Sequence, residues 1–424
     1  MPEMKNSGIE WIGEIPVEWK VIRVKDKYYF DTGFTPDTQQ QEYYSDENGF
    51  EWATISDVKN GKICYPTKSL ISRKYVNMTH KKPMPIGCLL YSFKLSVGET
   101  AITDRELFTN EAIACFHPDE ENNIRFLKYS SSLIEYNANT NIYGAKILNQ
   151  QLINDAYIVF PPLHIQERIA KFLDKKCNKI DELSNDIQKE IETLEEYKKA
   201  IIFELLTHGI NNEELHESNS DVWGQIPKSW KIKDIKYVFE IVKRIAGKEG
   251  YDILSVTQNG LKVKDISNNE GQIAADYSGY QFVYPTDYVM NHMDLLTGWV
   301  DCSTMFGVTS PDYRVFRLLD KKNNNLTYFK YLMQCCYLNK IFYSLGQGVS
   351  NLGRWRLQTS TFMNFKIPVP PMDEQEKIAE YLDKKCLEID GLIKDKKEQL
   401  EVLEQYKKSI IFEYVTGKKT VTEE

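Results

Sequence analysis

The segment that decides the fold reads Pro161-Pro162-Leu163-His164-Ile165-Gln166-Glu167-Arg168-Ile169-Ala170-Lys171-Phe172-Leu173-Asp174-Lys175-Lys176-Cys177. It returns 209 residues later as Pro370-Pro371-Met372-Asp373-Glu374-Gln375-Glu376-Lys377-Ile378-Ala379-Glu380-Tyr381-Leu382-Asp383-Lys384-Lys385-Cys386. Between 161–207 and 370–416, 26 of the 47 aligned positions are identical, far more than chance allows. A shorter repeat opens each half, Trp11-Ile12-Gly13-Glu14-Ile15-Pro16-Val17-Glu18-Trp19 against Trp223-Gly224-Gln225-Ile226-Pro227-Lys228-Ser229-Trp230. The chain is therefore an internal duplication of order A-B-A′-B′.

Both copies of the long repeat predict a helix that enters a coiled coil. Pro-Pro cannot continue a strand and leads into a helix start, and in the second copy Asp373 can cap while Glu376 completes a capping box. Apolar residues then recur every seven positions, with further apolar rows between them: Leu173, Ile180, Ile187, Leu194 and Ile201, then Cys177, Leu183, Ile191 and Tyr197. A helix this long needs a partner along its length. We expect Gln166–Thr207 and Gln375–Thr416 to pair antiparallel and to hold the globular parts at opposite ends.

The segments in front of the two helices predict mixed α/β domains with a strand-rich core. Short runs rich in Val, Ile, Tyr, Phe and Thr, such as 88–93 and 313–317, alternate with turn residues, and helices are expected near Ile124–Tyr136 and Leu326–Leu338. The fold class is therefore α+β, with pseudo-two-fold symmetry from the duplication. The predicted boundaries are 1–160 for the first domain, 161–207 for the central helix, 208–219 for a linker, 220–368 for the second domain, 369–417 for the distal helix and 418–424 for a tail.

Composition describes an ordinary globular protein. We expect no signal peptide and no membrane partner, since the N-terminus has no apolar core and no apolar run approaches the ~20 residues of a membrane span. The eight cysteines contain no Cys-x-x-Cys pair and are expected to be reduced in the cytoplasm. The net charge of −8 hides an asymmetry, because residues 220–368 hold 18 basic and 13 acidic side chains, a balance of +5. That segment is the first place to expect phosphate contacts, with solvated surface as the alternative.

The motifs resemble those of one family, the specificity subunits of type I restriction-modification enzymes. The resemblance rests on Gly-x-Ile-Pro-x-x-Trp, on Pro-Pro-x-x-x-Gln-Glu-x-Ile-Ala-x-x-Leu-Asp, and on Leu-Glu-x-Tyr-Lys-Lys-x-Ile-Ile-Phe-Glu-x-x-Thr, here Leu194–Thr207 and Leu403–Thr416. It implies two target-recognition domains that each read half of a split sequence in double-stranded DNA. It also implies two DNA methyltransferase subunits docked on the scaffold and motor-nuclease restriction subunits that join them. S-adenosylmethionine and ATP are expected only on those partners, so this chain should carry no cofactor and no metal.

Candidate DNA-binding residues follow from turns and cations in the two domains. Thr32-Gly33-Phe34-Thr35-Pro36 is similar to a family turn, with Arg244–Lys248 at the corresponding place of the second domain. Tyr143-Gly144-Ala145-Lys146 aligns with Leu352-Gly353-Arg354-Trp355, where a glycine lets backbone approach a ligand and a cation can reach phosphate or guanine. A plain turn with a solvated cation is the alternative. The candidates are Thr35, Lys94, Ser96, Tyr143, Lys146, Arg244, Lys248, Thr309, Ser350, Asn351, Arg354 and Trp355.

Candidate partner-binding residues are those that the two helices repeat. They are Gln166, Glu167, Tyr197, Lys198 and Phe203 in the first copy and Gln375, Glu376, Tyr406, Lys407 and Phe412 in the second.

The sequence carries no catalytic signature. It has no Gly-x-x-x-x-Gly-Lys-Ser/Thr phosphate loop and no Asn-Pro-Pro-Tyr or Asp-Pro-Pro-Tyr methylation motif. A nuclease-like Glu196-Tyr197-Lys198, with Asp186 ahead of it, becomes Gln405-Tyr406-Lys407 in the second copy, and both lie on predicted helix. The sequence therefore predicts a non-enzymatic protein. The rival to DNA recognition is a coiled-coil scaffold whose globular ends bind protein.

Overall fold

The computed structural model describes residues 3–421 apart from 46, 60, 142–143, 145, 266–275 and 349–354. The chain forms two compact units. Unit 1 comprises residues 1–187 and 399–424, and unit 2 comprises residues 188–398. Each unit thus contains one globular domain and a part of both long helices. None of the helices in the described part of the chain combines the length and apolar character that a membrane span requires.

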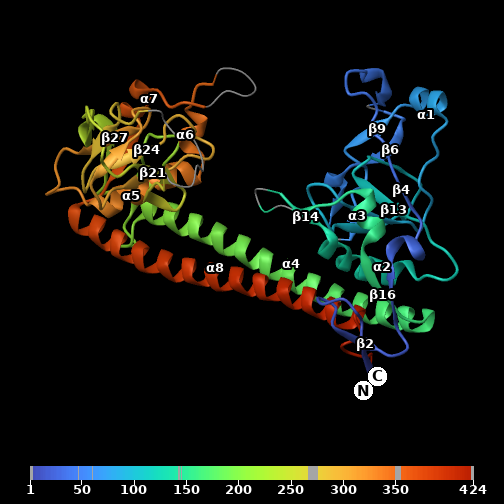
Figure 1. The fold of residues 1–424 in the computed structure, drawn as a ribbon. Helices are drawn as coiled ribbons and strands as arrows, with labels where there is room; N and C mark the ends of the chain where they lie inside the picture. The colour runs from blue at the N-terminus through green and yellow to red at the C-terminus, as the bar shows by residue number, and fades with distance from the viewer. Residues whose placement is uncertain are drawn as a thin grey trace. The chain divides into compact units, whose positions relative to one another are not determined.

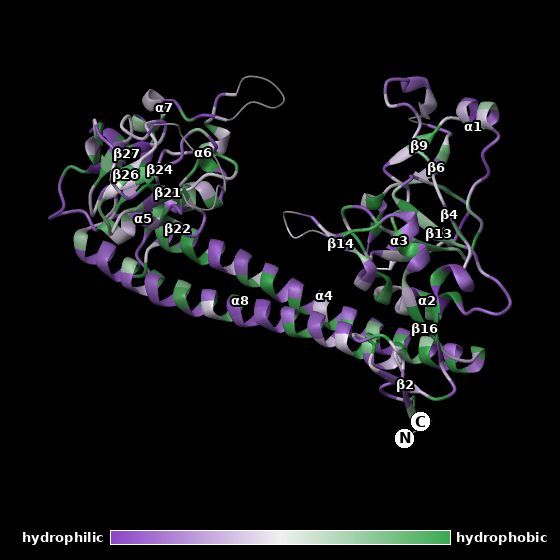
Figure 2. Cartoon of the chain, viewed as in Figure 1, coloured by the Kyte–Doolittle hydropathy of each residue, from purple (hydrophilic) through white to green (hydrophobic). Residues whose placement is uncertain are grey.

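The two long helices are α4 (Leu163–His208) and α8 (Met372–Val415), which confirms both predicted helices (Figure 1). Each begins directly after Pro-Pro, because a proline at a helix start lacks only an N–H that would have had no partner. Asp373 lies in the first turn of α8 and is not its cap, so the predicted capping box at this helix start is wrong. In Figure 2 purple and green residues alternate along both helices, as expected for helices with one apolar face.

Ion pairs join the two long helices in each unit, and in unit 2 two of them establish an antiparallel arrangement. In unit 2, Glu190 of α4 pairs with Lys396 of α8 (2.5 Å), and further along α4 Lys198 pairs with Asp390 (2.6 Å), earlier on α8. In unit 1, Asp181 pairs with Lys407 at 2.6 Å. Asp181 and Lys407 occupy the same repeat positions as Asp390 and Lys198, so the duplication is preserved in the helix register. Lys396, the one residue that interrupts the apolar seam, is accommodated by its ion pair.

The predicted coiled-coil seam is wider than the observed one. Ile180, Ile187 and Ile191 are buried, whereas Leu183 and Tyr197 are about half exposed. The heptad pattern fixes which residues share a stripe but not how wide a stripe the partner helix covers.

Unit 1 is built on two four-stranded sheets, of order β11-β10-β13-β4 and β12-β6-β9-β5. Two-stranded pairs β1-β2, β3-β16, β7-β8 and β14-β15 complete it. The strands are β1 (Met4–Asn6), β2 (Glu14–Pro16), β3 (Lys20–Arg23), β4 (Phe30–Thr32), β5 (Tyr44–Ser45), β6 (Phe50–Ala53), β7 (Val58–Lys59), β8 (Lys62–Ile63), β9 (Ser69–Ile71), β10 (Leu89–Ser92), β11 (Thr100–Ile102), β12 (Phe108–Thr109), β13 (Ile113–Phe116), β14 (Asn139–Thr140), β15 (Lys146–Ile147) and β16 (Tyr157–Phe160). The short helices are α1 (Arg73–Thr79), α2 (Ile124–Ser130) and α3 (Gln150–Asp155), and 3-10 turns include η4 (Ser131–Asn137).

Unit 2 repeats the central sheet as β25-β24-β27-β20, the same order along the chain as β11-β10-β13-β4. Pairs β17-β18 and β19-β28 repeat β1-β2 and β3-β16, while β21-β22 and β23-β26 form the rest. The strands are β17 (Leu215–Glu217), β18 (Gln225–Pro227), β19 (Lys231–Asp234), β20 (Phe239–Val242), β21 (Leu254–Thr257), β22 (Gly260–Val263), β23 (Gln281–Val283), β24 (Tyr288–Met290), β25 (Val300–Cys302), β26 (Gly307–Thr309), β27 (Arg314–Leu318) and β28 (Lys366–Val369). The helices are α5 (Leu326–Leu338), α6 (Ile341–Ser344) and α7 (Thr359–Met363). Strand β17 lies inside the segment predicted as a linker.

The two main cores combine domain and helix residues. In unit 1, Ile169 and Leu173 of α4 and Ile410 of α8 pack with the central sheet and α2. In unit 2, Leu206 of α4 and Leu382 of α8 pack with the corresponding sheet and α5. In each unit the globular domain therefore packs against both helices through apolar surface. Burial of such surface stabilises the folded state by about 25 cal/mol per Å².

Gly417, two residues after the end of α8, packs closely against Pro16 and Trp19. Gly417 has φ +73°, and an added Cβ would collide with Pro16 and lie 2.9 Å from Trp19 Cζ3. We expect Gly417→Ala to lower the free energy of unfolding by about 2–4 kcal/mol, from the left-handed backbone and overpacking together. Gly8→Ala is the matched control, since Gly8 has φ +79° with open space around it and isolates the backbone cost. Urea denaturation that gives equal losses for the two variants would contradict the packing contribution.

Candidate DNA interface and partner surfaces

A buried glutamine fixes each domain to the start of a long helix. Gln166 Oε1 accepts from the Asn123 N–H (3.0 Å) and its Nε2 donates to the Pro161 carbonyl (2.9 Å). Gln375 does the same with Asn325 N–H (2.8 Å) and the Pro370 carbonyl (2.9 Å). Both side chains are fully buried. The prediction that Gln166 and Gln375 bind a partner is therefore wrong; their repetition reflects domain attachment.

A tyrosine makes a second attachment in each unit. Tyr129 Oη donates to Asp174 of α4 (2.6 Å), and Tyr331 Oη donates to Asp383 of α8 (2.8 Å). Burial raises the pKa of both phenols, so they remain donors. A cation accompanies each carboxylate, Arg125 on Asp174 and Lys330 on Asp383. With the glutamines, these contacts orient each domain on its helix.

The other predicted partner residues fall into two groups. Lys198 and Lys407 form the ion pairs between the helices. The Phe203 ring stacks on the Trp223 ring, and the ring centroids of Phe412 and Tyr136 lie 6.3 Å apart. These four therefore contact the chain itself. Exposed side chains remain at Glu167, Glu376, Tyr197 and Tyr406.

An exposed apolar pair, missed from the sequence, accompanies the tyrosines. Leu183 and Leu392 hold the same repeat position and are each about half exposed, like Tyr197 and Tyr406. Leu183 lies two residues after Asp181 and Tyr406 one residue before Lys407, which form an ion pair in unit 1. Leu392 and Tyr197 hold the same places relative to the Asp390–Lys198 pair in unit 2. We call each set of leucine, tyrosine and ion pair a helix patch. The sequence analysis assigned Leu183 to the seam, so the available signal was only that both copies hold leucine at this repeat position.

In unit 1 the described DNA-binding candidates gather around two glutamates. Thr35 Oγ1 donates to Glu111, and this hydrogen bond, with a smaller contribution from Lys94, lowers the pKa of Glu111. Lys146 Nζ pairs with Glu135 at 2.7 Å, and Glu135 also abuts Gly98 in the loop that carries Lys94 and Ser96. All four described candidates are exposed: Thr35, Lys94 and Ser96 lie on loops, and Lys146 is the first residue of β15. Tyr143 lies outside the described residues.

The fold of unit 2 brings together Arg244, Lys248 and Thr309, but the three differ in burial and in hydrogen-bond partners. The segment 244–248 bonds to residues 278–282, and β23 pairs with β26. Thr309 is fully buried and donates to the Leu254 carbonyl (2.9 Å), so its predicted DNA contact is wrong. Arg244 pairs with Asp287, which is almost completely buried, and Lys248 is exposed.

The end of the second domain holds the remaining candidates. Trp355 is exposed in part, its ring lies 5.3 Å from that of Tyr343, and its carbonyl accepts from the Leu295 N–H (3.2 Å). Ser350, Asn351 and Arg354 lie outside the described residues.

Four aromatic residues that the sequence did not single out lie beside Arg244 and Lys248. We call Tyr251, Phe282, Tyr284 and Phe306 the aromatic ledge. In and after β23, buried Gln281 and Val283 alternate with the more exposed Phe282 and Tyr284. An aromatic outward face on an alternating strand was the available signal.

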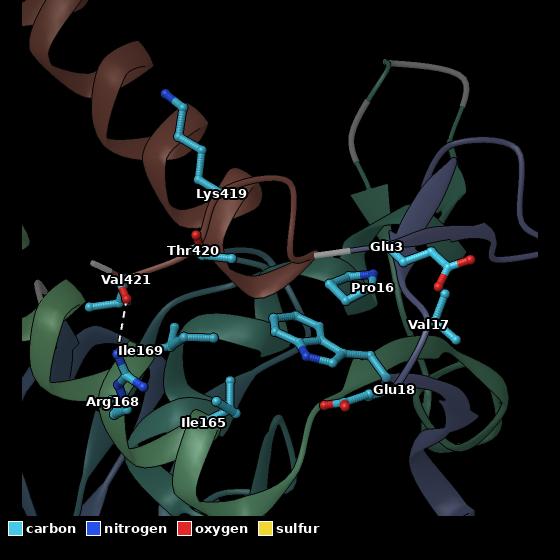
Figure 3. A pocket seen from close by; sticks show the side chains of 11 residues that line it. Glu3, Pro16, Val17, Glu18, Ile165, Arg168, Ile169, Lys419, Thr420 and Val421 are labelled. Atoms are coloured by element: carbon cyan, nitrogen blue, oxygen red, sulfur yellow. Dashed lines mark hydrogen bonds between the residues drawn. The ribbon is translucent and has the colours of Figure 1, made fainter. Parts of the chain in front are cut away.

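A cavity of about 450 Å³ lies in unit 1 between β2, the start of α4 and the segment after α8. Figure 3 shows Ile165 and Ile169 of α4 lining it, with Arg168 hydrogen bonded to the Val421 carbonyl. In unit 2 the position of Ile165 is taken by Glu374, whose Oε2 accepts from Trp230 Nε1 (2.8 Å). Equivalent positions at the two helix starts therefore hold an apolar side chain in unit 1 and a buried carboxylate in unit 2.

Comparisons with known proteins identify what this architecture resembles. The family model for the type I restriction modification DNA specificity domain matches twice, at residues 16–193 and 227–402. The MjaVIII specificity subunit of Methanocaldococcus jannaschii is 24% identical, over 95% of this chain and 93% of its own length. The putative MjaX specificity subunit of the same organism is 26% identical, over 96% and 95%. A solved chain from a structure on complex assembly and conformational transition of the type I R-M system has a TM-score of 0.65 at 15% identity, covering 96% of this chain and 99% of that one.

Proposed function

The chain belongs to the type I restriction modification DNA specificity family, whose function is recognition of a DNA target, and from this premise we propose that each of its two domains reads one half of a bipartite sequence. The supporting observation is that the two family matches fall chiefly on the two compact units. The central sheets share one strand order while the surface loops carry different residues. One fold with two surfaces suits two different half-sites, because bases are read by the side chains on a scaffold and not by the scaffold itself.

We propose that the chain is the non-catalytic member of its complex and works in the cytoplasm. Its sequence has neither a phosphate loop nor an adenine-methylation motif. S-adenosylmethionine and ATP would then bind the methyltransferase and the motor-nuclease subunits. The chain would contribute the target sequence and the positions of its partners.

The helix patches are the surfaces that we propose for the two methyltransferase subunits. Each patch offers an exposed leucine on one long helix and an exposed tyrosine on the other, and aromatic side chains such as tyrosine often supply much of the energy of protein interfaces. The same patch occurs once in each unit, so one partner surface could fit both. Motor-nuclease subunits would join through the methyltransferases.

We expect Leu183→Asp or Leu392→Asp to reduce bound methyltransferase from two copies to one, and the double variant to bind none. A buried carboxylate without a partner would oppose docking strongly. Leu387→Asp is the control, since Leu387 is more exposed than either and its repeat position holds Asn178. Native mass spectrometry counts the subunits. Two methyltransferases on the double variant would contradict this assignment.

The function is tested by mobility shift of a duplex library with randomised sequence. The chain with its co-purified methyltransferase should enrich duplexes that share two specified blocks. The single chain should transfer no methyl group from S-adenosylmethionine to the same DNA. Methylation by the chain alone would contradict the non-catalytic assignment, and binding without any sequence preference would contradict target recognition.

A further inference from the structure

The aromatic ledge of unit 2 exposes rings that form a continuous set of contacts. Tyr284 is 41% exposed and Phe306 is 44% exposed. Their ring centroids lie 5.1 Å apart, and Phe306 stacks on Phe282 at 5.7 Å with 22° between the planes. Tyr251 meets both phenylalanines edge-on, at 5.0 and 5.9 Å. An exposed cluster of large rings of this kind is typical of a binding surface.

The ledge is held rigidly and bordered by positive charge. The Arg244 guanidinium lies over the Tyr284 ring, 4.7 Å from its centroid, while it pairs with Asp287. Asp287 also accepts from the Tyr284 backbone N–H at 2.8 Å, so one buried carboxylate fixes both the arginine and the tyrosine. Lys248 lies 5.7 Å from the centroid of Tyr251. A ligand on the ledge therefore meets partly exposed aromatic rings with the Lys248 ammonium at their border, a combination that suits a base attached to phosphate.

We propose that the aromatic ledge contacts DNA bases in the half-site read by unit 2, and that Lys248 at its edge contacts phosphate. The inference rests on the proposed function and adds the residues and the type of contact. Arg244 then acts as a positioning residue, which keeps Tyr284 in place, and not as the phosphate-binding cation that its charge alone indicates. Aromatic rings reach bases either by stacking on their faces or by contact with the thymine methyl group.

The phosphate contact and the aromatic contacts affect the salt dependence of DNA affinity differently. Loss of a phosphate contact lowers the slope of log affinity against log salt by about 0.9, because one fewer counterion is released. Loss of an aromatic contact lowers affinity at every salt concentration and leaves the slope unchanged. Phe306→Ala and Tyr284→Ala should each weaken binding about 5- to 100-fold. Lys248→Ala should reduce the slope and weaken all sequences alike.

The test uses the full chain with its co-purified methyltransferase and the randomised duplex library, followed by titration of the selected duplex at several salt concentrations. Tyr237→Ala is the matched control, because Tyr237 is 67% exposed in the same unit with Lys236 over its ring at 5.2 Å and lies outside the ledge. Phe306→Leu retains apolar contact with thymine methyl but not stacking. A duplex with deoxyuridine in place of thymine removes the methyl group and so distinguishes the two kinds of contact.

The expected result is that Phe306→Ala and Tyr284→Ala blur base preference in one block only, with an unchanged salt slope, while Tyr237→Ala behaves as the parent does. Parent-like affinity and base preference in both ledge variants would overturn the ledge and leave the proposed function standing. A changed salt slope with intact base preference would also overturn it. A parent protein that enriches no sequence would instead overturn the proposed function itself.

Discussion

Exchange of residues 220–368 for the second domain of another family member should change one block of the methylated sequence completely and leave the other block unaltered. The physical reason is that the attachment contacts repeat in both units. Gln375 and Asp383 bond to the start of α5 and to Tyr331, as Gln166 and Asp174 bond to α2 and Tyr129. A foreign domain with these partners can therefore attach to the same helix without disturbing the domain of unit 1.

The exchange is read by methylome sequencing of a host that expresses the hybrid with its methyltransferase. The reciprocal exchange of residues 1–160 is the matched control and should alter only the other block. Simultaneous change of both blocks in either hybrid would mean that the domains do not read independently.

Gln375→Leu should be the most destabilising single substitution on the surface where a domain meets its helix. The side chain accepts from the Asn325 N–H and donates to two carbonyls, those of Pro370 and Asn323 (2.9 and 3.3 Å), all in a buried setting. Leucine leaves these groups without their partner, at a cost of roughly 1–3 kcal/mol for each buried group that stays unsatisfied. We expect a loss of about 2–5 kcal/mol in the stability of unit 2.

Hydrogen exchange gives the most local measure of that loss. Protection of the α5 backbone should fall in Gln375→Leu, since its first turn is next to the lost acceptor. Gln405→Leu is the control, because Gln405 is exposed on α8, the helix that also carries Gln375. This substitution should leave the protection of α5 unchanged. Equal protection in Gln375→Leu and the parent would contradict the attachment role.

The parts of the fold that the sequence predicts are those governed by local chemistry. Pro-Pro followed by apolar heptads predicts α4 and α8 because proline is tolerated only at a helix start and a long helix needs an apolar stripe. Helix α5 was expected at Leu326–Leu338 and is found there. In unit 1 the expected helix Ile124–Tyr136 tightens after Ser130 into the 3-10 turn η4. Helix pairing follows from the duplication, although Leu183 and Tyr197 show that the heptad pattern overstates the seam.

The candidate site was less predictable because it depends on contacts distant in sequence. Arg244 looks like a phosphate ligand until Asp287, 43 residues later, is found to neutralise it. Thr309 is a candidate from the sequence, but it ends β26, is fully buried and donates to the Leu254 carbonyl of β21. Repetition of Gln166 and Gln375 marks attachment to a domain and not to a partner, and a duplicated sequence alone does not separate these causes. The aromatic ledge is assembled from residues 251, 282, 284 and 306, which only the fold brings together.

The central claim is that two domains read two separate half-sites, and methylome sequencing of a host that expresses the parent chain with its methyltransferase tests it most directly. The result we predict is an asymmetric target of two specified blocks divided by an unspecified spacer. A continuous target, or a palindromic one, would contradict two independent readers.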